Sequence, residues 1–366
     1  MNILLLNWRD RTNPRAGGAE VVTEEVASRL ARKGHHITLF TSRFPKSTAQ
    51  ETRAGYTIVR HGNEWTVHMW ALIYWFKKLR HEQFDVVIDQ IHGIPFFTPL
   101  YMRTTRKVVF IHEVAREIWL TMYPWPINYI GYFLEPRILR LYKKVPFITV
   151  SQSTKDDLIA AGISSAMISL VSEAITLTPF LTLPSKEDNP TLIFVGRLAP
   201  MKRVEDIIKA FQIVQQHISR LTLWVVGHHS DAAYANQLKK LASNDQSIVF
   251  HGFVSEDQKQ KLLSRAWLLL NTSLKEGFGL NVIEAAACGT PAVTYNVPGL
   301  REAVRDRETG LLTGENTPEN LASQITALIQ DQNRYRIMQQ NALDYSRQFT
   351  FDRTAEEFEK IISATL

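Results

Sequence analysis

Short apolar runs rich in β-branched residues alternate with longer amphipathic stretches along the whole chain. Runs of this kind, bounded by polar or glycine-containing segments, are typical of buried strands, and the stretches between them have the period of helices. The first series of expected strands comprises Asn2–Leu6, His36–Phe40, Thr57–Arg60, Val86–Ile88, Lys107–Ile111, Phe147–Val150 and Ile168–Val171. The second series comprises Thr191–Val195, Leu221–Val226, Ile248–His251, Leu268–Asn271, Pro291–Tyr295 and Gly310–Leu312.

Apolar strands separated by helices indicate parallel sheets that are covered on both faces. We therefore predict an α/β protein with two doubly wound domains and a cleft between them, in which ligands bind outside the carboxyl ends of the strands. The expected boundaries are a first domain over 1–175, a proline-containing linker over 176–190, a second domain over 191–350, and a final helix over 351–366. We expect this helix to pack back on the first domain.

The composition is that of a soluble globular protein, with 366 residues of which 45% are hydrophobic and 21% charged. A membrane-spanning helix needs about 20 apolar residues in a row, and no stretch of the sequence reaches that length. The opening residues Met1–Asn7 have a strand pattern without a basic leader. The single cysteine, Cys288, cannot form an internal disulfide, which favours a reducing compartment. We expect a cytoplasmic protein, peripheral on the inner face of the membrane if it associates with one.

The net charge of +6 is concentrated in the first half of the chain. Residues 1–180 contain 22 Lys/Arg and 15 Asp/Glu (22 − 15 = +7), whereas residues 181–366 contain 20 and 21 (20 − 21 = −1). A nucleic acid, an anionic membrane surface or an acidic substrate would each account for this excess. A solvated basic face without a partner accounts for it equally well.

Two aromatic stretches lie in the same basic half, next to Lys77-Lys78 and Lys143-Lys144. Tryptophan and tyrosine beside lysine are typical of a membrane interface or of an apolar acceptor groove. Aromatic residues at this spacing are equally typical of a core between helices. The residues concerned are Trp65, Trp70, Tyr74, Trp75 and Phe76 in the first stretch, and Trp119, Tyr123, Trp125, Tyr129, Tyr132 and Phe133 in the second.

The segment from Lys275 to Pro291 gives the strongest indication of chemistry. Gly277 and Gly279 free the backbone just before an expected helix, so that unpaired N–H groups can face an anion. Glu276 stands at this point, and Glu284 is expected two turns into the helix, because eight steps at 3.6 residues per turn return to nearly the same face. Two carboxylates on either side of an anion site suit a ligand with phosphate in its middle and hydroxyl-bearing rings at both ends. A nucleotide-sugar has this form.

Three further segments are candidate site elements. Gly196, Arg197 and Lys202 follow the expected strand Thr191–Val195, where two cations can bind a diphosphate. Gly17-Gly18 at a helix start is a possible phosphate cradle, although it lacks the spacing of a dinucleotide or P-loop site and is also typical of a plain turn. His112 ends an apolar strand, where a ligand contact and a hydrogen-bonded cap are both reasonable interpretations.

The histidines and the single cysteine do not have the spacing of a metal site. His35-His36 and His228-His229 are adjacent pairs, which cannot place two imidazoles on one helical face. We therefore expect no metal ion and no cofactor.

These segments, in this order, resemble glycosyltransferase family 4, a group of retaining nucleotide-sugar transferases with the GT-B architecture. The resemblance covers nearly the whole chain. Its most specific part is the block from Glu276 through Glu284 to Pro291, and the weaker parts gain weight from their order. These parts are Gly17–Glu20, His112-Glu113, Val150–Ser153 and Gly196-Arg197 with Lys202.

The resemblance implies a role for each matching residue. Glu276 would hold the donor sugar, and the amides of Gly277, Phe278, Gly279 and Leu280 would hold its phosphate. Glu284 would bind the ribose hydroxyls. Arg197 and Lys202, which follow Gly196, would neutralise the diphosphate leaving group, Gly17 and Gly18 would close over it, and His112 would contact the transferred sugar. The anomeric configuration would be retained without a metal, by same-face attack with the departing phosphate as base.

The chain departs from the usual family pattern at Ser172–Ile175, where Asn-Gly-Val/Ile-Asp is common, and at Gly227–Ser230, where Gly-x-Gly-Pro is common. The nucleotide base and the sugar are therefore not assigned. We expect transfer of a hexose-type sugar to a glycan, lipid-linked or small-molecule acceptor, with no nucleic-acid partner. The alternatives are a sugar-nucleotide epimerase on the same fold and a non-catalytic protein that binds a membrane or nucleic acid.

Overall fold

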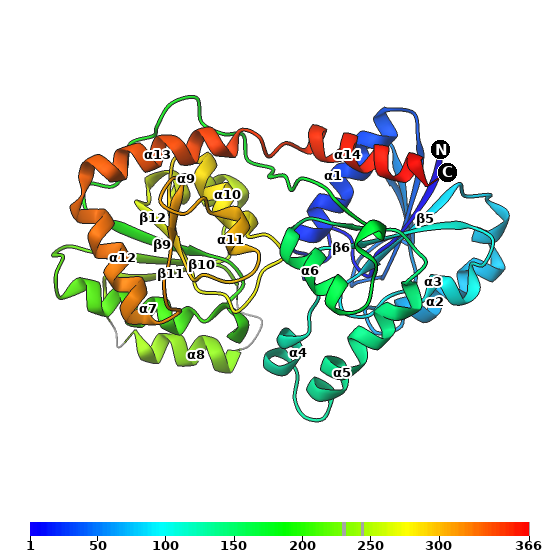
Figure 1. Cartoon of the computed structure of the whole chain (residues 1–366), viewed down its shortest axis with the longest axis horizontal. Coiled ribbons are helices and arrows are strands. Elements are labelled where there is room, and N and C mark those ends of the chain that lie inside the picture. Colours follow the sequence, from blue (N-terminus) through cyan, green and yellow to red (C-terminus); the bar gives the residue numbers. More distant parts are fainter. Residues whose placement is uncertain (229–231, 243–244, 366) are drawn as a thin grey trace. The chain divides into compact units, whose positions relative to one another are not determined.

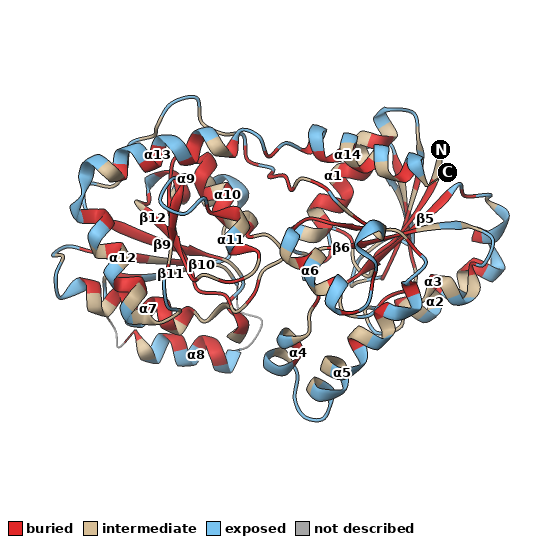
Figure 2. Ribbon diagram, viewed as in Figure 1, coloured by how far each residue is buried: buried red, intermediate tan, exposed pale blue. Residues whose placement is uncertain are grey.

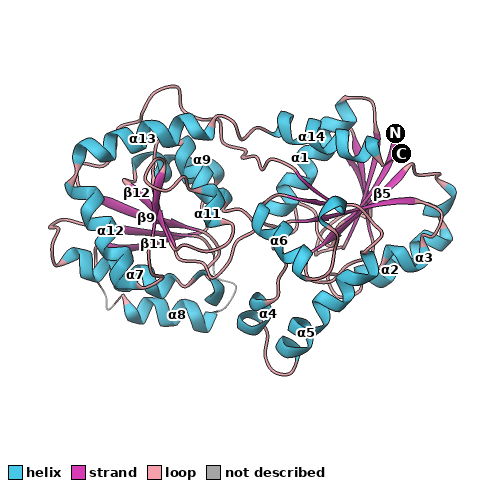
Figure 3. Ribbon diagram, viewed as in Figure 1, coloured by secondary structure: helices cyan, strands magenta, loops and turns pink. Residues whose placement is uncertain are grey.

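The computed structural model describes residues 1–228, 232–242 and 245–365, which form two compact units (Figure 1). The first unit comprises Met1–Trp119, Trp125–Ala174 and the chain from Thr350 onward, and the second comprises Leu120–Pro124 and Ile175–Phe349. Each unit contains one sheet with helices packed on its faces (Figure 3). Within the described ranges, no helix is long and apolar enough to cross a lipid bilayer.

The sheet of the first unit has the strand order β3-β4-β2-β1-β5-β6-β7-β8 and is parallel except at the β3 edge. Its central strands are almost entirely buried, which explains why they are apolar along their whole length (Figure 2). The parallel strands are β1 (Asn2–Leu6), β2 (His36–Thr41), β4 (Tyr56–Arg60), β5 (Val86–Ile91), β6 (Arg106–Ile111), β7 (Phe147–Thr149) and β8 (Ile168–Leu170).

The edge strand β3 (Gln50–Arg53), which runs antiparallel to β4, was not predicted. Its four residues are all polar, and none of them is buried. A strand at the edge of a sheet does not need the apolar pattern on which strand prediction rests. The first sheet is therefore parallel, as expected, in all its described strands except this one.

Strand β5 continues to Ile91, beyond the predicted end at Ile88. The polar residue that interrupts its apolar pattern, Asp89, is fully buried but well bonded. Its carboxylate accepts hydrogen bonds from the hydroxyls of Tyr142 (2.6 Å) and Thr98 (2.8 Å) and from the amide of Phe96 (3.0 Å). A buried carboxylate with this many donors does not need to end a strand.

The helices of the first unit include the last helix of the chain, α14, which packs against α1. Arg29 binds Asp352 at 2.6 Å and Lys33 binds Glu359 at 2.7 Å, while Phe358 packs edge-on against Phe110 with ring centroids 5.3 Å apart. The helices are α1 (Gly18–Arg32), α2 (Val67–Lys77), α3 (Thr98–Tyr101), α4 (Glu117–Met122), α5 (Ile127–Leu139), α6 (Gln152–Ala160) and α14 (Phe351–Ala364), with 3-10 turns η1 (Leu79–His81), η2 (Arg140–Tyr142) and η3 (Ser165–Met167).

The sheet of the second unit has the strand order β11-β10-β9-β12-β13-β14, and its pairs are all parallel within the described residues. Its strands are β9 (Thr191–Val195), β10 (Thr222–Val226), β11 (Ile248–Gly252), β12 (Leu268–Asn271), β13 (Ala292–Thr294) and β14 (Gly310–Leu312). Its helices are α7 (Val204–Gln215), α8 (Ala232–Leu241), α9 (Glu256–Arg265), α10 (Leu280–Ala287), α11 (Leu300–Ala303), α12 (Pro318–Gln330) and α13 (Gln332–Ser346), with the 3-10 turn η4 (Pro200–Lys202).

In each sheet the chain reverses its direction of strand addition at one point. This switch point lies between β1 and β5 in the first unit and between β9 and β12 in the second. Ligands of doubly wound sheets bind outside the carboxyl ends of the strands at such points. The loops that follow these four strands are therefore the first places to look for a site.

The segment 176–190, which we expected to be a linker, is part of the second unit. The amide of Phe180 donates to the carbonyl of Ala287 at 3.0 Å, and the ammonium of Lys186 donates to the hydroxyl of Thr290 at 2.6 Å. The segment joins the two sheets, but its hydrogen bonds attach it to the end of α10.

Candidate functional site

The loops after β9 and β12, on either side of the second switch point, are bonded to each other. The hydroxyl of Thr272 donates to the carbonyls of Lys202 and Arg203, both at 2.9 Å. The side-chain amide of Asn281 donates to the carbonyl of Val195, also at 2.9 Å. These bonds fix the segment that contains Lys202 against the segment that contains Glu276.

Lys202 and Glu276 form a short ion pair at this point, with Nζ 2.6 Å from Oε1. The same oxygen accepts hydrogen bonds from the hydroxyl of Ser273 at 2.7 Å and the amide of Asn271 at 3.3 Å. Burial by itself would raise the pKa of Glu276, but Lys202, Ser273 and Asn271 outweigh it and hold the pKa below its usual value. Glu276 is therefore ionised at neutral pH, and its remaining capacity is to accept hydrogen bonds, as from sugar hydroxyls.

The start of α10 presents unbonded backbone amides beside this ion pair. Gly279 has a φ of 96°, which lets the chain turn into the helix at Leu280. In the part of the chain that the structure describes, no hydrogen bond from the amides of Gly277, Phe278, Gly279 or Leu280 occurs. Free amides and the positive end of the helix dipole together suit a phosphate.

Gly299 allows the Glu276 loop to approach the loop after β13. Its φ is 82°, and a Cβ at this position would lie 2.1 Å from the carbonyl oxygen of Glu276. The amide of Glu276 in turn donates to the carbonyl of Pro298 at 3.2 Å. A side chain at residue 299 would displace the backbone that carries the carboxylate.

Glu284 does not lie two turns into the helix, so this expectation is wrong. Helix α10 begins at Leu280, which places Glu284 one turn in, and Glu276 lies in the preceding loop. Helical periodicity therefore does not relate the two carboxylates, because the Gly277–Gly279 segment is not helical. Each carboxylate has its own lysine instead.

The partner of Glu284 is Lys259 in α9, with Nζ 2.8 Å from Oε1. Lys259 also binds Glu256 at 2.8 Å. Burial raises the pKa of Glu284, and the attraction of Lys259 offsets this only in part. Glu276 and Glu284 are both largely buried, since 15% of each side chain is accessible to solvent.

Arg197 and Gly196 lie where β9 ends. Arg197 is exposed and has no ion pair among the residues that the structure describes. The backbone beside it is crowded, because a Cβ on Gly227 would lie 1.8 Å from the carbonyl oxygen of Gly196. Gly227 thus allows the ends of β9 and β10 to meet, a role that we did not predict. His229 and Ser230, which follow in the departure from the family pattern, lie outside the described residues.

In the first unit, Gly17 and Gly18 lie at the start of α1 after the loop that follows β1. The amide of Gly17 donates to Oε2 of Glu20 at 2.7 Å, so the helix supplies its own carboxylate there. Oε1 of Glu20 is bound by Arg9 at 3.2 Å. The amide of Gly18 has no acceptor in the described part of the chain. In the expected phosphate cradle, the amide of Gly17 is therefore already hydrogen-bonded within the protein, and the amide of Gly18 is available to a ligand.

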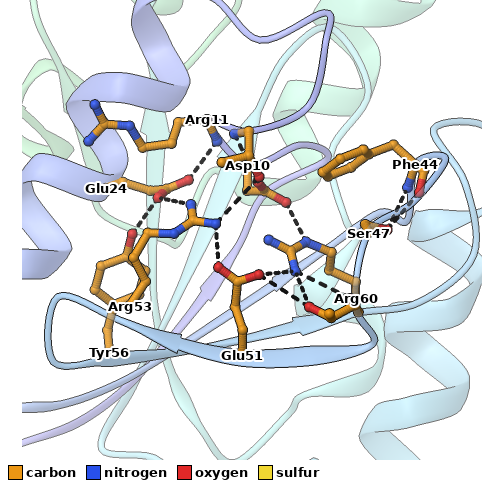
Figure 4. Close-up of polar contacts among 11 residues, drawn as sticks. Asp10, Arg11, Glu24, Phe44, Ser47, Glu51, Arg53, Tyr56 and Arg60 are labelled. Carbon is orange, nitrogen blue, oxygen red and sulfur yellow. Dashed lines mark hydrogen bonds and ion pairs between the residues drawn. The ribbon is translucent and has the colours of Figure 1, made fainter.

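A cluster of ion pairs holds the loop that leads to Gly17 (Figure 4). The buried Arg60 binds Asp10 at 2.7 Å and Glu51 at 2.9 Å. Glu24 of α1 accepts hydrogen bonds from the amide of Arg11 at 2.6 Å and from the hydroxyl of Tyr56. The otherwise marginal strand β3, which contributes Glu51, thereby anchors the loop.

His112 lies at the end of β6, with Nδ1 3.3 Å from Oε1 of Glu173, which follows β8. Its Nε2 is buried and has no hydrogen-bond partner among the residues that the structure describes. His92, which follows β5, stacks between His112 and Trp8, with ring centroids 6.2 and 5.8 Å away. Burial lowers the pKa of His92 to about 4, so this ring is neutral at pH 7.

The ring stack Trp8–His92–His112 connects the loop after β1 to the end of β6 at the first switch point. The expected site residues Gly17, Gly18 and His112 therefore lie in segments that follow the carboxyl ends of strands in the first sheet. The remaining expected site residues belong to the second unit. Sequence reasoning missed His92 and Glu173, because no motif connects them to His112. In the described ranges, no group of three or more His, Cys, Asp or Glu side chains is arranged to hold a metal ion.

Comparison with known proteins gives two family matches that together extend over most of the chain. Residues 16–178 match the family described as Glycosyltransferase Family 4, and residues 182–345 match the family described as Glycosyl transferases group 1. Over 379 aligned residues the chain is 24% identical to a protein of Methanocaldococcus jannaschii named Uncharacterized glycosyltransferase MJ1069, with 95% of each chain covered.

Solved structures share the architecture of the whole chain. The sucrose-phosphate synthase of Thermosynechococcus elongatus superposes with a TM-score of 0.81 at 20% identity, covering 99% of this chain and 98% of that one. Anabaena HepE, solved in complex with UDP and glucose, superposes with a TM-score of 0.76 at 16% identity and covers 100% of both chains. At these identities the likeness concerns the fold, and the predicted GT-B class with two parallel α/β sheets is confirmed.

Proposed function

Because this chain belongs to glycosyltransferase group 1/family 4, whose members transfer a sugar from a nucleotide-sugar, we propose that it transfers a hexose-type sugar with retention of the anomeric configuration. The donor is a nucleoside-diphosphate-sugar bound by the second unit. The acceptor is a glycan, a lipid-linked saccharide or a small molecule, and the first unit binds it.

The observation that supports this proposal most directly is the ion pair between Lys202 and Glu276 beside the open amides at the start of α10. A diphosphate needs positive charge and N–H donors, and a sugar needs acceptors for its hydroxyl protons. Lys202 and the amides of Gly277–Leu280 supply the first, and ionised Glu276 supplies the second. Both lie at the switch point of the second sheet, where ligands of such sheets bind.

The remaining residues of the second unit complete the donor site in this proposal. Arg197, exposed at the end of β9, binds the diphosphate and stabilises the charge that develops when it departs. Glu284 accepts hydrogen bonds from the ribose hydroxyls. When Glu284 binds the ribose, its partner Lys259 still has an ion pair with a second carboxylate, that of Glu256.

In the first unit, His112 contacts the transferred sugar, and Gly17 and Gly18 approach the diphosphate. The bond between the anomeric carbon and the diphosphate oxygen breaks, and a bond from the acceptor oxygen forms on the same face. The acceptor proton passes to the departing phosphate oxygen. The protein then contributes mainly electrostatic stabilisation, and the proposal requires no metal.

UDP-glucose is the first donor to test, because HepE was solved in complex with it. The cytoplasm is the proposed compartment, where nucleoside-diphosphate sugars are made available to such enzymes. A lipid-linked acceptor would add a peripheral association with the membrane.

The test is a panel of UDP-, GDP- and ADP-sugars, with release of nucleoside diphosphate and thermal protection as readouts. We expect one class of donor to give both nucleoside diphosphate release and thermal protection. Silence with every donor and no protection by any nucleotide would refute the proposal. Conversion of the donor sugar without an acceptor would indicate an epimerase, and binding that is steeply salt-dependent but insensitive to Glu284→Gln would indicate a non-catalytic protein.

A further inference from the structure

The two aromatic stretches of the first unit divide into buried and exposed members. Trp75 and Trp119 are buried and belong to the core, whereas Trp65 and Trp125 are 83% and 79% exposed. The interpretation as a core between helices therefore holds for the buried members, and the interpretation as an interface or acceptor groove stays a prediction for the exposed ones. The exposed members remain to be explained.

Helix α5 turns most of its large apolar side chains toward solvent. A helix that only covers its own unit turns its apolar stripe to the core. Here the buried side of α5 carries Glu135 and Leu139. The exposed apolar residues of α5, with the one that precedes it, are Trp125, Ile127, Tyr129, Ile130, Phe133 and Leu134.

The exposed ionic groups of the segment 120–146, which contains α5, have one sign. Residues 120–146 contain four basic residues and one acidic residue, Glu135. Glu135 is buried, where it accepts hydrogen bonds from the amides of Ala115 (2.9 Å) and Arg116 (2.6 Å) and from the indole of Trp119 (3.1 Å). The basic residues Arg137, Arg140, Lys143 and Lys144 are exposed and have no carboxylate partner in the described residues.

We propose that this α5 surface, formed by the six apolar residues and the four basic residues named above, docks on an anionic lipid bilayer. Exposed tryptophan, phenylalanine and isoleucine beside unpaired lysine and arginine have the composition of helices that lie in the membrane interface. The helix itself is too short to span the bilayer, so it lies along the surface. In Figure 2 much of the α4–α5 region is coloured as exposed or intermediate.

The charge argues against a second copy of this chain as the occupant. In a symmetric dimer the same patch faces itself, so Lys143 and Lys144 would be placed against identical cations. An anionic bilayer offers the opposite charge to all four basic residues at once. It also offers an apolar layer beneath that charge, which matches the mixed composition of the α5 surface.

The other exposed apolar stripe of this unit, on α2, is less well suited. Trp65, Met69 and Phe76 are exposed there, next to Lys77 and Lys78. However, Lys78 has an acidic neighbour, because its Nζ lies 3.9 Å from Glu82 Oε1. The α2 stripe thus carries less uncompensated charge than the α5 surface, because within the described residues only Lys77 and Arg80 have no carboxylate partner there.

This inference deepens the proposed function and rests on it for its purpose, because a membrane-bound first unit could receive a lipid-linked acceptor directly. Docking itself does not require transferase activity. The two can therefore be measured separately on the same protein sample.

The experiment is co-sedimentation of the full-length protein with vesicles of phosphatidylcholine alone and of phosphatidylcholine with phosphatidylglycerol. We expect binding to the anionic vesicles that is at least tenfold tighter and that weakens in high salt. Each basic residue near an anionic surface contributes about fivefold to binding. Lys143→Glu/Lys144→Glu should therefore lower binding roughly 25-fold or more, and Ile130→Ser/Phe133→Ser should lower it on both vesicle types.

Two matched controls make the result specific. Ile337→Ser removes an equally exposed apolar residue from α13 of the second unit and should leave binding unchanged. Lys77→Glu/Lys78→Glu makes the same charge change at α2 and should have less than half the effect, in fold-change, of the α5 pair. A larger effect at α2, or equal binding to neutral and anionic vesicles, would overturn the proposal.

Nucleoside diphosphate release in the absence of vesicles separates this inference from the proposed function. The α5 variants should keep the wild-type release rate with a soluble donor, which also shows that they fold. Wild-type release with no vesicle binding would overturn the docking inference alone. Vesicle binding without release from any donor would leave docking supported and contradict the proposed function.

Discussion

Nζ of Lys202 lies 2.6 Å from Oε1 of Glu276, although the two residues are 74 positions apart in the sequence. The pairing follows from topology, because β9 and β12 are neighbours in the sheet and their following loops meet at its switch point. A cation for the diphosphate and a carboxylate for the sugar are thereby held next to each other before any donor binds. The geometry is set in advance, as electrostatic stabilisation requires.

We predict that Lys202→Met lowers kcat/KM by about 100- to 1,000-fold, the range observed when one transition-state donor is removed. The cation is lost, and Glu276 remains buried without its counter-ion. Lys239→Met, which removes an exposed lysine on α8, is the matched control and should be silent. Steady-state kinetics with the identified donor provide the measurement, and a Lys202→Met enzyme within about threefold of wild type would contradict the assignment.

The lowered pKa of Glu276 predicts how its contribution to stability varies with pH. A carboxyl whose pKa is lower in the folded than in the unfolded state stabilises the fold above its ordinary value of 4.5. This contribution is lost as the pH falls through the folded-state pKa. Wild type should therefore melt at a higher temperature than Glu276→Gln at pH 7, and the gap should close below pH 4.5. A gap that stays constant on acidification would show that the ion pair does not stabilise the fold.

Glu284 should behave in the opposite sense, because its pKa is raised by burial. Ionised Glu284 is disfavoured in the free protein, so Glu284→Gln should raise the melting temperature at pH 8 and lose this advantage as the pH falls and wild-type Glu284 becomes protonated. Lys259 keeps Glu256 as a partner in this variant. Protection by nucleotide should be lost at the same time. A variant that melts lower at pH 8 but is still protected by nucleotide would contradict both expectations.

His112 and Glu173 give a prediction for the first unit. With Nδ1–H directed to Glu173, the imidazole keeps the lone pair on Nε2 for a hydrogen bond from a sugar hydroxyl. Glu173→Gln should lower kcat by about 10- to 100-fold, the value of one hydrogen bond to a charged group, and leave the KM for the donor within about threefold. The ring nitrogen shifts of His112 should report a changed tautomer population. Unchanged shifts, or a loss expressed in KM alone, would exclude a positioning role for Glu173.

Gly299 and Gly252 form a matched pair, since both have a positive φ (82° and 68°) but only Gly299 faces backbone. Gly252→Ala meets open space and incurs only conformational strain of about 1 kcal/mol. Gly299→Ala must also displace the carbonyl of Glu276, so it should cost clearly more stability and at least tenfold in activity. Chemical denaturation and kinetics of the two variants test this, and equal effects would contradict it.

The strands could be predicted from the sequence because burial on both faces requires apolar residues throughout. β9, β12 and β14 begin and end where the apolar runs do. β3 escaped prediction because its stability comes from pairing with β4 and from ion pairs of Glu51 and Arg53, which no local pattern reveals. An edge strand made of polar residues can be recognised only once its neighbours in the sheet are placed.

The candidate site could be predicted only in part, for a similar reason. The end of a predicted strand placed Arg197 and Lys202 in the site, and the glycines before a predicted helix placed Glu276 there. Extending the periodicity of α10 back through Gly277 and Gly279 gave Glu284 the wrong position, because glycine permits non-helical backbone as readily as helix. The ring stack on His92 depends on tertiary packing alone, so spacing in the sequence carries no signal of it.

The attachment of α14 to α1 has a consequence for synthesis. The strands of the first sheet are translated early, but the helix that packs on Phe110 and binds Arg29 and Lys33 is translated only after the second unit. In a nascent chain, the surface of the first unit that α14 covers therefore stays exposed until the whole second unit has been synthesised. Premature termination before Phe351 would remove this helix, so truncated products should aggregate through the surface left uncovered on α1 and at Phe110.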